Sequence, residues 1–144
     1  MSVGSKLFVG RSARTNADGV AQLEGVFGDR VVVVEMPPNV LHLKCVCSPL
    51  GEDRVLLAAA SINPSTFTGL EVLIVPAEET YAANAVALGT SVIVAADHPR
   101  TRDTLALAGF HVLPVPTTEV RRADGSLTCQ SILFGGAAPS SRAR

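Results

Sequence analysis

The sequence predicts an α/β fold in which three similar modules follow one another and form part of a ring. Three apolar runs end in proline, and the final prolines Pro37, Pro76 and Pro116 are 39 and 40 residues apart. A second apolar run and a segment with helix-start signals precede each of these runs. Because a fixed period of about 40 residues is typical of repeat architectures, we interpret each period as one strand, helix and strand.

The first module is predicted as a strand over residues 7–10, a helix over 11–27 and a second strand over 31–37. Apolar residues recur in the helical segment at spacings of three and four, at Val20, Leu23 and Phe27. This spacing gives the helix one apolar stripe that can pack on a sheet.

The second and third modules repeat this order. Residues 55–60, 63–70 and 72–76 form the second module, and residues 91–96, 97–110 and 112–116 form the third. The middle helix is predicted to be weak because residues 66–69 are poor helix formers. In the third helix Leu105 and Ala108 share a face, and Gly109 is a suitable C-terminal stop.

A further strand-like run follows each proline, beginning near His42, Asn84 and Cys129. In a radial array, corresponding strands start close to a common axis, so His42 and Cys129 are predicted to converge. Three modules are too few to complete a circle. We therefore expect residues 1–134 to form one incomplete ring-like domain and the small, polar residues 135–144 to form a disordered tail.

Composition narrows the class of protein. The chain has 144 residues, 47% of them hydrophobic and 17% charged, which is enough for one domain with a core. A net charge of −1 leaves no basic surface for nucleic acid. The longest apolar stretches, 31–34 and 55–60, are far shorter than the roughly 20 residues of a membrane span, so we expect no membrane contact. The start resembles no secretory leader, which favours the cytoplasm.

Cys129 is the strongest candidate for a nucleophile. It follows the turn signal Asp124-Gly125 at the mouth of an apolar run. A thiolate attacks electrophilic carbon well, although a lone cysteine is more often a small buried apolar residue. His42, where a loop enters a predicted strand, is a candidate proton carrier for a leaving amine. The alternative for His42 is a purely structural histidine.

Other polar residues carry weaker predictions. Arg14 lies between a predicted strand and helix, where its guanidinium could bind a carboxylate; otherwise it is a surface charge. Asp124 is a turn former first and a ligand for a cationic group second. His98 and His111 are assigned structural positions, at a helix start and in a strand. Cys45 and Cys47 are expected on one face of a strand, and an odd count of three cysteines argues against a disulfide framework or a zinc site.

Four ordered motifs carry a resemblance to a known family. They are FVGRSARTN at residues 8–16, HLK at 42–44, YAAN at 81–84 and DGSLTC at 124–129. In this order they closely resemble the C-terminal half of dimethylarginine dimethylaminohydrolases, over residues 7–134. These belong to the guanidine-modifying enzymes, with arginine deiminases and amidinotransferases. The resemblance implies a five-bladed α/β propeller of ββαβ modules around a central channel, of which this chain would supply the last three.

The resemblance also implies residue roles. Cys129 would attack the guanidinium carbon and form a covalent intermediate, and His42 would protonate the leaving amine and then activate water. Arg14 would hold the substrate α-carboxylate, with Asp124 and the backbone carbonyl of Ala123 beside the substrate. The product would be citrulline, and no cofactor or metal is needed. A methylated arginine and arginine both remain open as substrate, the latter as in an arginine deiminase.

One departure from the family is informative. Family members carry an N-terminal half with acidic residues that bind the guanidinium, and residues 1–6 replace the Glu-Gly-Gly-Asp-like segment that precedes the Phe-Val-Gly strand. We therefore expect a homo-oligomer or a companion chain that supplies the other half. The alternative is a non-catalytic remnant or partner subunit.

Overall fold

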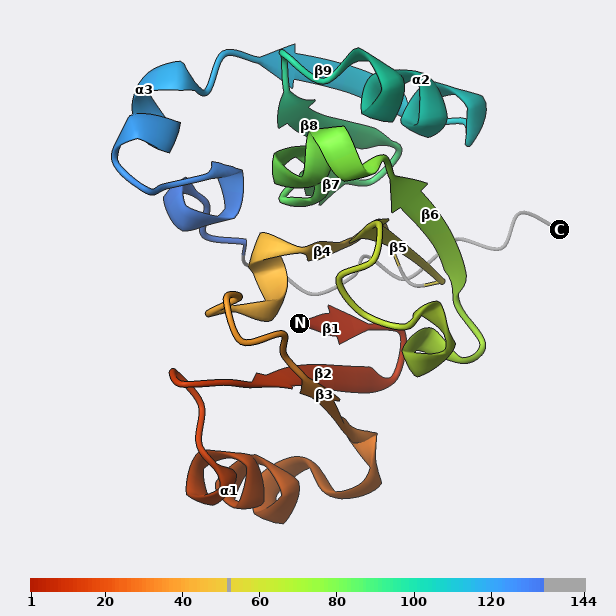
Figure 1. The fold of residues 1–144 in the computed structure, drawn as a ribbon. Helices are drawn as coiled ribbons and strands as arrows, with labels where there is room; N and C mark the ends of the chain where they lie inside the picture. The colour runs from red at the N-terminus through yellow and green to blue at the C-terminus, as the bar shows by residue number, and fades with distance from the viewer. Residues whose placement is uncertain (52, 134–144) are drawn as a thin grey trace, which may run out of the picture.

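A computed structural model describes residues 1–51 and 53–133, and these form three small mixed sheets in succession (Figure 1). The first sheet contains β1 (Ser2–Val3), β2 (Lys6–Arg11) and β3 (Val31–Glu35); the second contains β4 (Cys47–Pro49), β5 (Arg54–Ala58) and β6 (Glu71–Val75); the third contains β7 (Val86–Leu88), β8 (Ser91–Ala95) and β9 (His111–Val115). In each sheet the first two strands pair antiparallel and the last two pair parallel. The α/β fold with three repeated modules is thus confirmed.

A helical segment joins the two parallel strands of each module, which makes the repeat ββαβ. These segments are α1 (Ala17–Phe27), the 3-10 turn η3 (Pro64–Phe67) and α2 (Pro99–Leu107). The amide of Gly19 donates to the Asn16 side chain, which caps α1. The middle connection is reduced to a single 3-10 turn, in agreement with its poor helix formers.

Proline ends the second and third parallel ladders. Pro76 and Pro116 directly follow β6 and β9, and Pro37 comes two residues after β3. Proline has no backbone N–H to donate, so within sheets it is confined to edge strands and strand ends, as Pro114 in the edge strand β9 shows. The period read from the sequence therefore marks the end of each outer strand.

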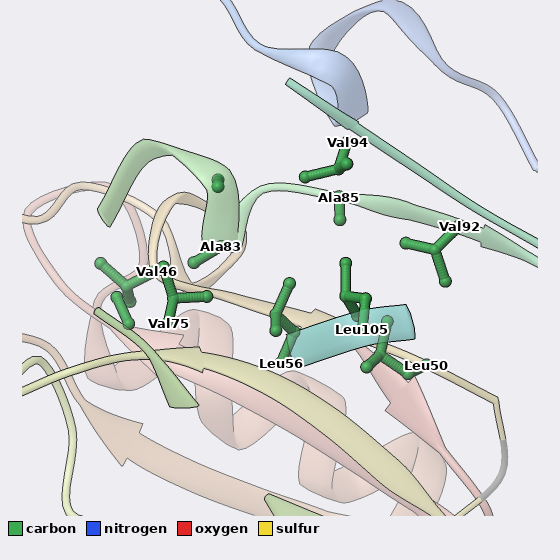
Figure 2. Packing of buried hydrophobic residues seen from close by; sticks show 11 residues of the cluster. Val46, Leu50, Leu56, Val75, Ala83, Ala85, Val92, Val94 and Leu105 are labelled. Carbon is green, nitrogen blue, oxygen red and sulfur yellow. The ribbon is translucent and has the colours of Figure 1, made fainter. Parts of the chain in front are cut away.

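The hydrophobic cores lie between neighbouring modules. Between the first and second, Phe67 of η3 packs on Phe8 of β2 with ring centroids 5.1 Å apart. Between the second and third, α2 packs on β6 as well as on its own β9. Figure 2 shows Leu105 of α2 among Leu50, Leu56 and Val92. The helical segment of one module therefore covers the sheet of the module before it.

The two ends of the array have no such cover among the described residues. Val26 at the end of α1 is 75% exposed, and Phe27 beside it is exposed as well. At the other end, Leu88 of β7 and Leu113 of β9 are 53% and 38% exposed. Apolar side chains that neighbours cover in the middle of the array are thus open at both ends.

Further short helical segments lie outside the strands, and the second and the last of them replace part of predicted strands. They are η1 (Gly28–Arg30), η2 (Leu43–Cys45), η4 (Ala77–Ala83), α3 (Thr118–Arg122) and η5 (Leu127–Gln130). The strand expected from His42 begins only at Cys47, and the run from Asn84 begins at Val86. The strand predicted from Cys129 is wrong, because that residue lies in η5 and residues 131–133 have no regular structure. The tail predicted over 135–144 lies outside the described residues.

No helix within residues 1–51 and 53–133 has the length and apolar character that a membrane crossing requires.

Candidate active site

Three short turns have the same backbone hydrogen bond: one precedes the second sheet, one precedes the third sheet, and one follows the third module. The amide of Cys45 donates to His42 O at 3.0 Å, that of Asn84 to Tyr81 O at 3.3 Å, and that of Cys129 to Ser126 O at 3.1 Å. Cys45, Asn84 and Cys129 are therefore equivalent positions. The sequence analysis placed His42 at the position equivalent to Asn84 and Cys129. That prediction was wrong by one helical turn, because Cys45 occupies the equivalent position.

These equivalent positions line one cavity of about 320 Å³. Its lining residues are Cys45, Tyr81, Asn84, Arg121, Asp124, Gly125, Ser126 and Cys129. Cys45 and Asn84 directly precede the second and third sheets, and Cys129 follows the third module. The Cys129 thiol is exposed, and Asp124 and Arg121 give the cavity one acidic and one basic side chain. Such a site can combine a soft nucleophile with a carboxylate for a cationic group.

The Asp-Gly turn that brings Asp124 to this cavity is the C-terminal cap of α3. The amide of Asp124 donates to Arg121 O at 3.1 Å and that of Gly125 to Val120 O at 2.9 Å. This is a Schellman motif, with Asp124 in the left-handed region at φ 55°. A Cβ on Gly125 would lie 2.9 Å from the Val120 side chain, so only glycine fits there.

Asn84 and Tyr81 hold the turn that carries Cys129. The amide of Thr128 donates to Asn84 Oδ1 at 2.9 Å, and the Tyr81 hydroxyl donates to Gly125 O at 2.9 Å. The Arg121 guanidinium lies over the Tyr81 ring at 4.8 Å. Sequence reasoning noted Tyr81 and Asn84 only as part of a motif and missed Arg121, which no local pattern distinguishes from a surface arginine.

His42 lies in a neighbouring cavity. It is exposed, precedes η2, and lines a larger cavity of about 500 Å³ that Lys44, Thr128 and Ser131 also line. Thr128 therefore separates the His42 cavity from that of Cys129. Among the described residues the hydroxyls of Ser126 and Thr128 are buried without a hydrogen-bond partner, so both can accept one from a ligand or water.

Arg14 and Ala123 lie outside both cavities. Arg14 is exposed in the turn between β2 and α1, where its amide donates to the Ser12 hydroxyl at 3.0 Å. Ala123 is the exposed C-cap residue of α3, directly before Asp124. The structure thus brings Cys129 and Asp124 together and leaves His42 and Arg14 farther out.

The remaining candidates have structural positions. Cys45 and Cys47 do not share a face, since Cys45 is exposed in η2 and Cys47 is buried in β4. Burial raises the pKa of the Cys47 thiol to about 12. His98 precedes α2 and stacks on Tyr81 with ring centroids 5.8 Å apart, and His111 begins β9. The described residues contain no cluster of three or more His, Cys, Asp and Glu suited to a metal ion.

Comparison with known proteins gives named relatives but no family model. The chain is 36% identical over 137 residues to an N(G),N(G)-dimethylarginine dimethylaminohydrolase of Pseudomonas aeruginosa, covering 93% of this chain and 54% of the relative. A crystal structure of that kind of enzyme from P. aeruginosa, a cysteine-to-serine mutant complexed with citrulline, is 36% identical with a TM-score of 0.77 and covers 87% and 50% of the two chains. An amidinotransferase from Microseira wollei, 20% identical, shares the fold with a TM-score of 0.78 over 88% of this chain and 43% of its own. The chain spans about half the length of these relatives.

Proposed function

We propose, because this chain is a homologue of the dimethylarginine dimethylaminohydrolases, that it forms the thiol-bearing half of a hydrolase of this kind. The activity would convert an N-methylated arginine to citrulline and a methylamine. One observation carries the proposal: the exposed Cys129 thiol shares a cavity with Asp124 at the inner ends of the modules. The relative complexed with citrulline supports the choice of substrate class.

The proposed reaction has two steps. The Cys129 sulfur attacks the guanidinium carbon, a C–S bond forms, and the C–N bond to the methylated nitrogen breaks as His42 gives that nitrogen a proton. A water molecule then attacks the same carbon while His42 accepts its proton, and the C–S bond breaks to release citrulline and the thiolate. General acid and base catalysis by one histidine suits a leaving amine near neutral pH.

Substrate binding is assigned by charge. Asp124 and the carbonyl of Ala123 would lie beside the cationic substrate, and Arg14 would bind its α-carboxylate in two parallel hydrogen bonds. Arg14 lies outside the Cys129 cavity. Its role therefore requires the substrate to extend from the cavity toward the turn between β2 and α1.

The array is proposed to be three blades of a five-bladed propeller. Exposed Val26 at one end and exposed Leu88 and Leu113 of the third sheet at the other are the apolar surfaces that further blades would cover. Ser131–Leu133 follows η5 just as β4 and β7 follow their turns, so it is the inner strand of the next blade in this proposal. A companion chain or a second copy would supply that neighbour.

We propose a cytoplasmic location. The three cysteines form no disulfide, and unpaired thiols suit a reducing compartment.

A non-catalytic subunit is the second candidate function. The uncovered ends favour it, since a cation-binding half held elsewhere would be needed to align the substrate for attack. The two candidates differ in whether a complete assembly forms citrulline.

The test is citrulline release from asymmetric dimethylarginine and from arginine. The chain is assayed alone and co-expressed with the other half of the P. aeruginosa relative, and the ratio of the two rates identifies the substrate. Cys129→Ser is expected to reduce the rate more than about a thousandfold, and Cys47→Ala, which removes a buried thiol, is the matched control.

A haloamidine provides a readout that does not need turnover. It should alkylate Cys129 in the complemented protein in preference to Cys45. Citrulline formation that survives in Cys129→Ser would contradict the proposed nucleophile. Alkylation of Cys129 without any citrulline would favour the non-catalytic subunit.

A further inference from the structure

The cavity that contains Cys129 holds a second accessible thiol. Cys45 and Cys129 occupy equivalent positions of their turns, and both are exposed and line the same cavity of about 320 Å³. The proposed reaction uses only one of them. Cys45 is thus a nucleophilic group in the site with no assigned role.

The turns that carry the two thiols are fixed against the same element. η2 packs on η4. Asn84, which follows η4, accepts the amide of Thr128 next to Cys129 at 2.9 Å. A disulfide needs Cα atoms about 4.4–6.8 Å apart, so a bond between Cys45 and Cys129 requires the two turns to approach each other across the cavity that both line.

The third thiol differs sharply from these two. Cys47 is fully buried in β4, and burial raises its pKa to about 12, so it stays a thiol near neutral pH. Oxidation by a dissolved peroxide follows thiolate character and access. Chemistry at the cysteines of this chain is therefore confined to the pair that shares the cavity.

We propose that Cys45 is a resolving cysteine that converts oxidised Cys129 into a reversible disulfide. A hydroperoxide oxidises the Cys129 thiolate to a sulfenic acid and is itself reduced to an alcohol or water. The Cys45 sulfur then attacks the sulfenic sulfur, an S–S bond forms, and the hydroxyl leaves with the thiol proton as water. A thiol reductant restores both thiols.

This pair of thiols would act as a redox switch for the proposed hydrolase. Its role in regulation rests on that proposed function. The disulfide removes the nucleophile and occupies the cavity with a cross-link, so the oxidised protein is inactive. It also keeps Cys129 from the sulfinic acid, which ordinary reductants do not reverse.

The experiment follows the thiols by mass. Trypsin cleaves after Lys44 and leaves Cys45 and Cys47 on one peptide, so Cys47→Ala provides the background in which Cys45 is read alone. The full chain is treated with about three equivalents of hydrogen peroxide, enough to carry a thiol through sulfenic to sulfinic acid, alkylated with iodoacetamide and digested without reductant. We expect a cross-link between the Cys45 and Cys129 peptides, with the loss of two hydrogens, and complete recovery of alkylation after reduction.

Cys45→Ser in the same background is the decisive variant. Its Cys129 is expected to advance to sulfinic acid and to stay unalkylated after reduction. Equal recovery of Cys129 with and without Cys45, or disulfides that link two separate chains, would overturn the proposal. If Cys47→Ala does not fold, tandem mass spectrometry of the wild-type peptide locates the bond at residue 45 or 47.

The mass readout is independent of turnover. A protein that forms the cross-link when oxidised, but forms no citrulline when it is reduced and complemented, leaves the thiol pair established and the proposed hydrolase refuted. An active enzyme without the cross-link does the reverse.

Discussion

Asp124 has a backbone conformation that glycine adopts more easily. Its φ of 55° lies in the left-handed region, where an L side chain is strained, and it fills the position after α3 where helices commonly use glycine. Gly125 follows directly, yet the chain places the carboxylate at residue 124, facing the Cys129 cavity. A strained residue at a cavity is a reason to look for function there.

Asp124→Gly should therefore separate stability from function. We expect the free energy of unfolding to rise by about 0.5 to 1 kcal/mol because the strain is relieved. Haloamidine labelling of Cys129 in the complemented protein should fall at least about tenfold, since one charge-assisted hydrogen bond to the amidinium is lost. Urea unfolding and mass spectrometry measure the two quantities.

Ala60→Gly is the matched control for this variant. Ala60 has a φ of 56° and lines a different cavity, so it should gain stability without any change at Cys129. Equal loss of labelling in both variants would remove Asp124 from the site.

At the scale of elements, the N-terminus of α2 is capped by a side chain of η4. His98 makes no side-chain cap. Instead the buried Glu79 carboxylate of η4 accepts the amide of Arg100 at 3.1 Å and the amide and hydroxyl of Thr101 at 2.7 and 2.6 Å. Burial opposes the charge, but the hydrogen bonds from Thr101 and Arg100 outweigh it, and the pKa of Glu79 is lowered. This contact fixes α2 against η4, beside the turn that carries Asn84.

Glu79→Gln tests this cap. The NH2 group of the glutamine side chain would face the backbone amides of Arg100 and Thr101, which are donors themselves. We therefore expect the unfolding free energy to fall by about 1–3 kcal/mol at pH 7. The pKa of Glu79 in the folded chain is below the ordinary value of about 4.3. The carboxylate therefore contributes fully to the unfolding free energy above about pH 4.3, and this contribution disappears as the pH falls through the folded pKa. The stability gap between wild type and variant should then narrow from pH 5 toward pH 3 in urea titrations. A gap that is constant with pH would exclude a charged cap.

The repeated strands could be predicted from sequence, and the short turns could not. The apolar runs ending in proline located β3, β6 and β9 within one or two residues, because each strand is a largely apolar run that a proline closely follows. β1 has only two residues, and α3 has five. Segments this short contain too few periods for an apolar pattern to be visible.

The same limit applies to the candidate site. Cys129 and Asp124 were predicted together because they lie in one motif. Cys45 and Arg121 enter the cavity only through the equivalence of the turns and the path of α3, which are properties of the folded chain. Whether His42 and Arg14 complete the site stays a prediction.

For the whole molecule, the decisive feature is that the cores lie between modules. The first and second sheets are each covered by the helical segment of the next module: Phe67 covers Phe8, and Leu105 covers the second sheet. Stability in such arrays comes largely from interfaces between neighbours. The ends of the array therefore expose the surfaces that would carry the next interfaces.

Leu88→Asp tests the open end at the third sheet. We expect the wild-type chain to associate as its concentration rises and the variant to remain smaller, because a charge is inserted into an apolar contact. Light scattering after size-exclusion chromatography measures the mass. The unfolding free energy of the variant as a monomer should differ from that of the wild type by less than about 0.5 kcal/mol, as is usual for exposed positions.

Leu107→Asp is the control, since Leu107 is 91% exposed on α2, which packs between the second and third sheets and not on the open face of the third sheet. An equal effect of both variants on the mass would point to unspecific stickiness. A wild-type chain that stays monomeric at all concentrations would contradict the use of these ends between copies.

The two open ends are unlike surfaces, one made by α1 and the other by the third sheet. Contact between copies at these ends is heterologous, head to tail, and it closes only if the rotation per copy divides a full turn. Two copies would bring six modules to a ring proposed to have five, so a second copy overfills the circle, whereas a chain of two modules completes it. Copies alone would then add in one direction as an open, polar filament, and a two-module companion would act as the closure that ends its growth.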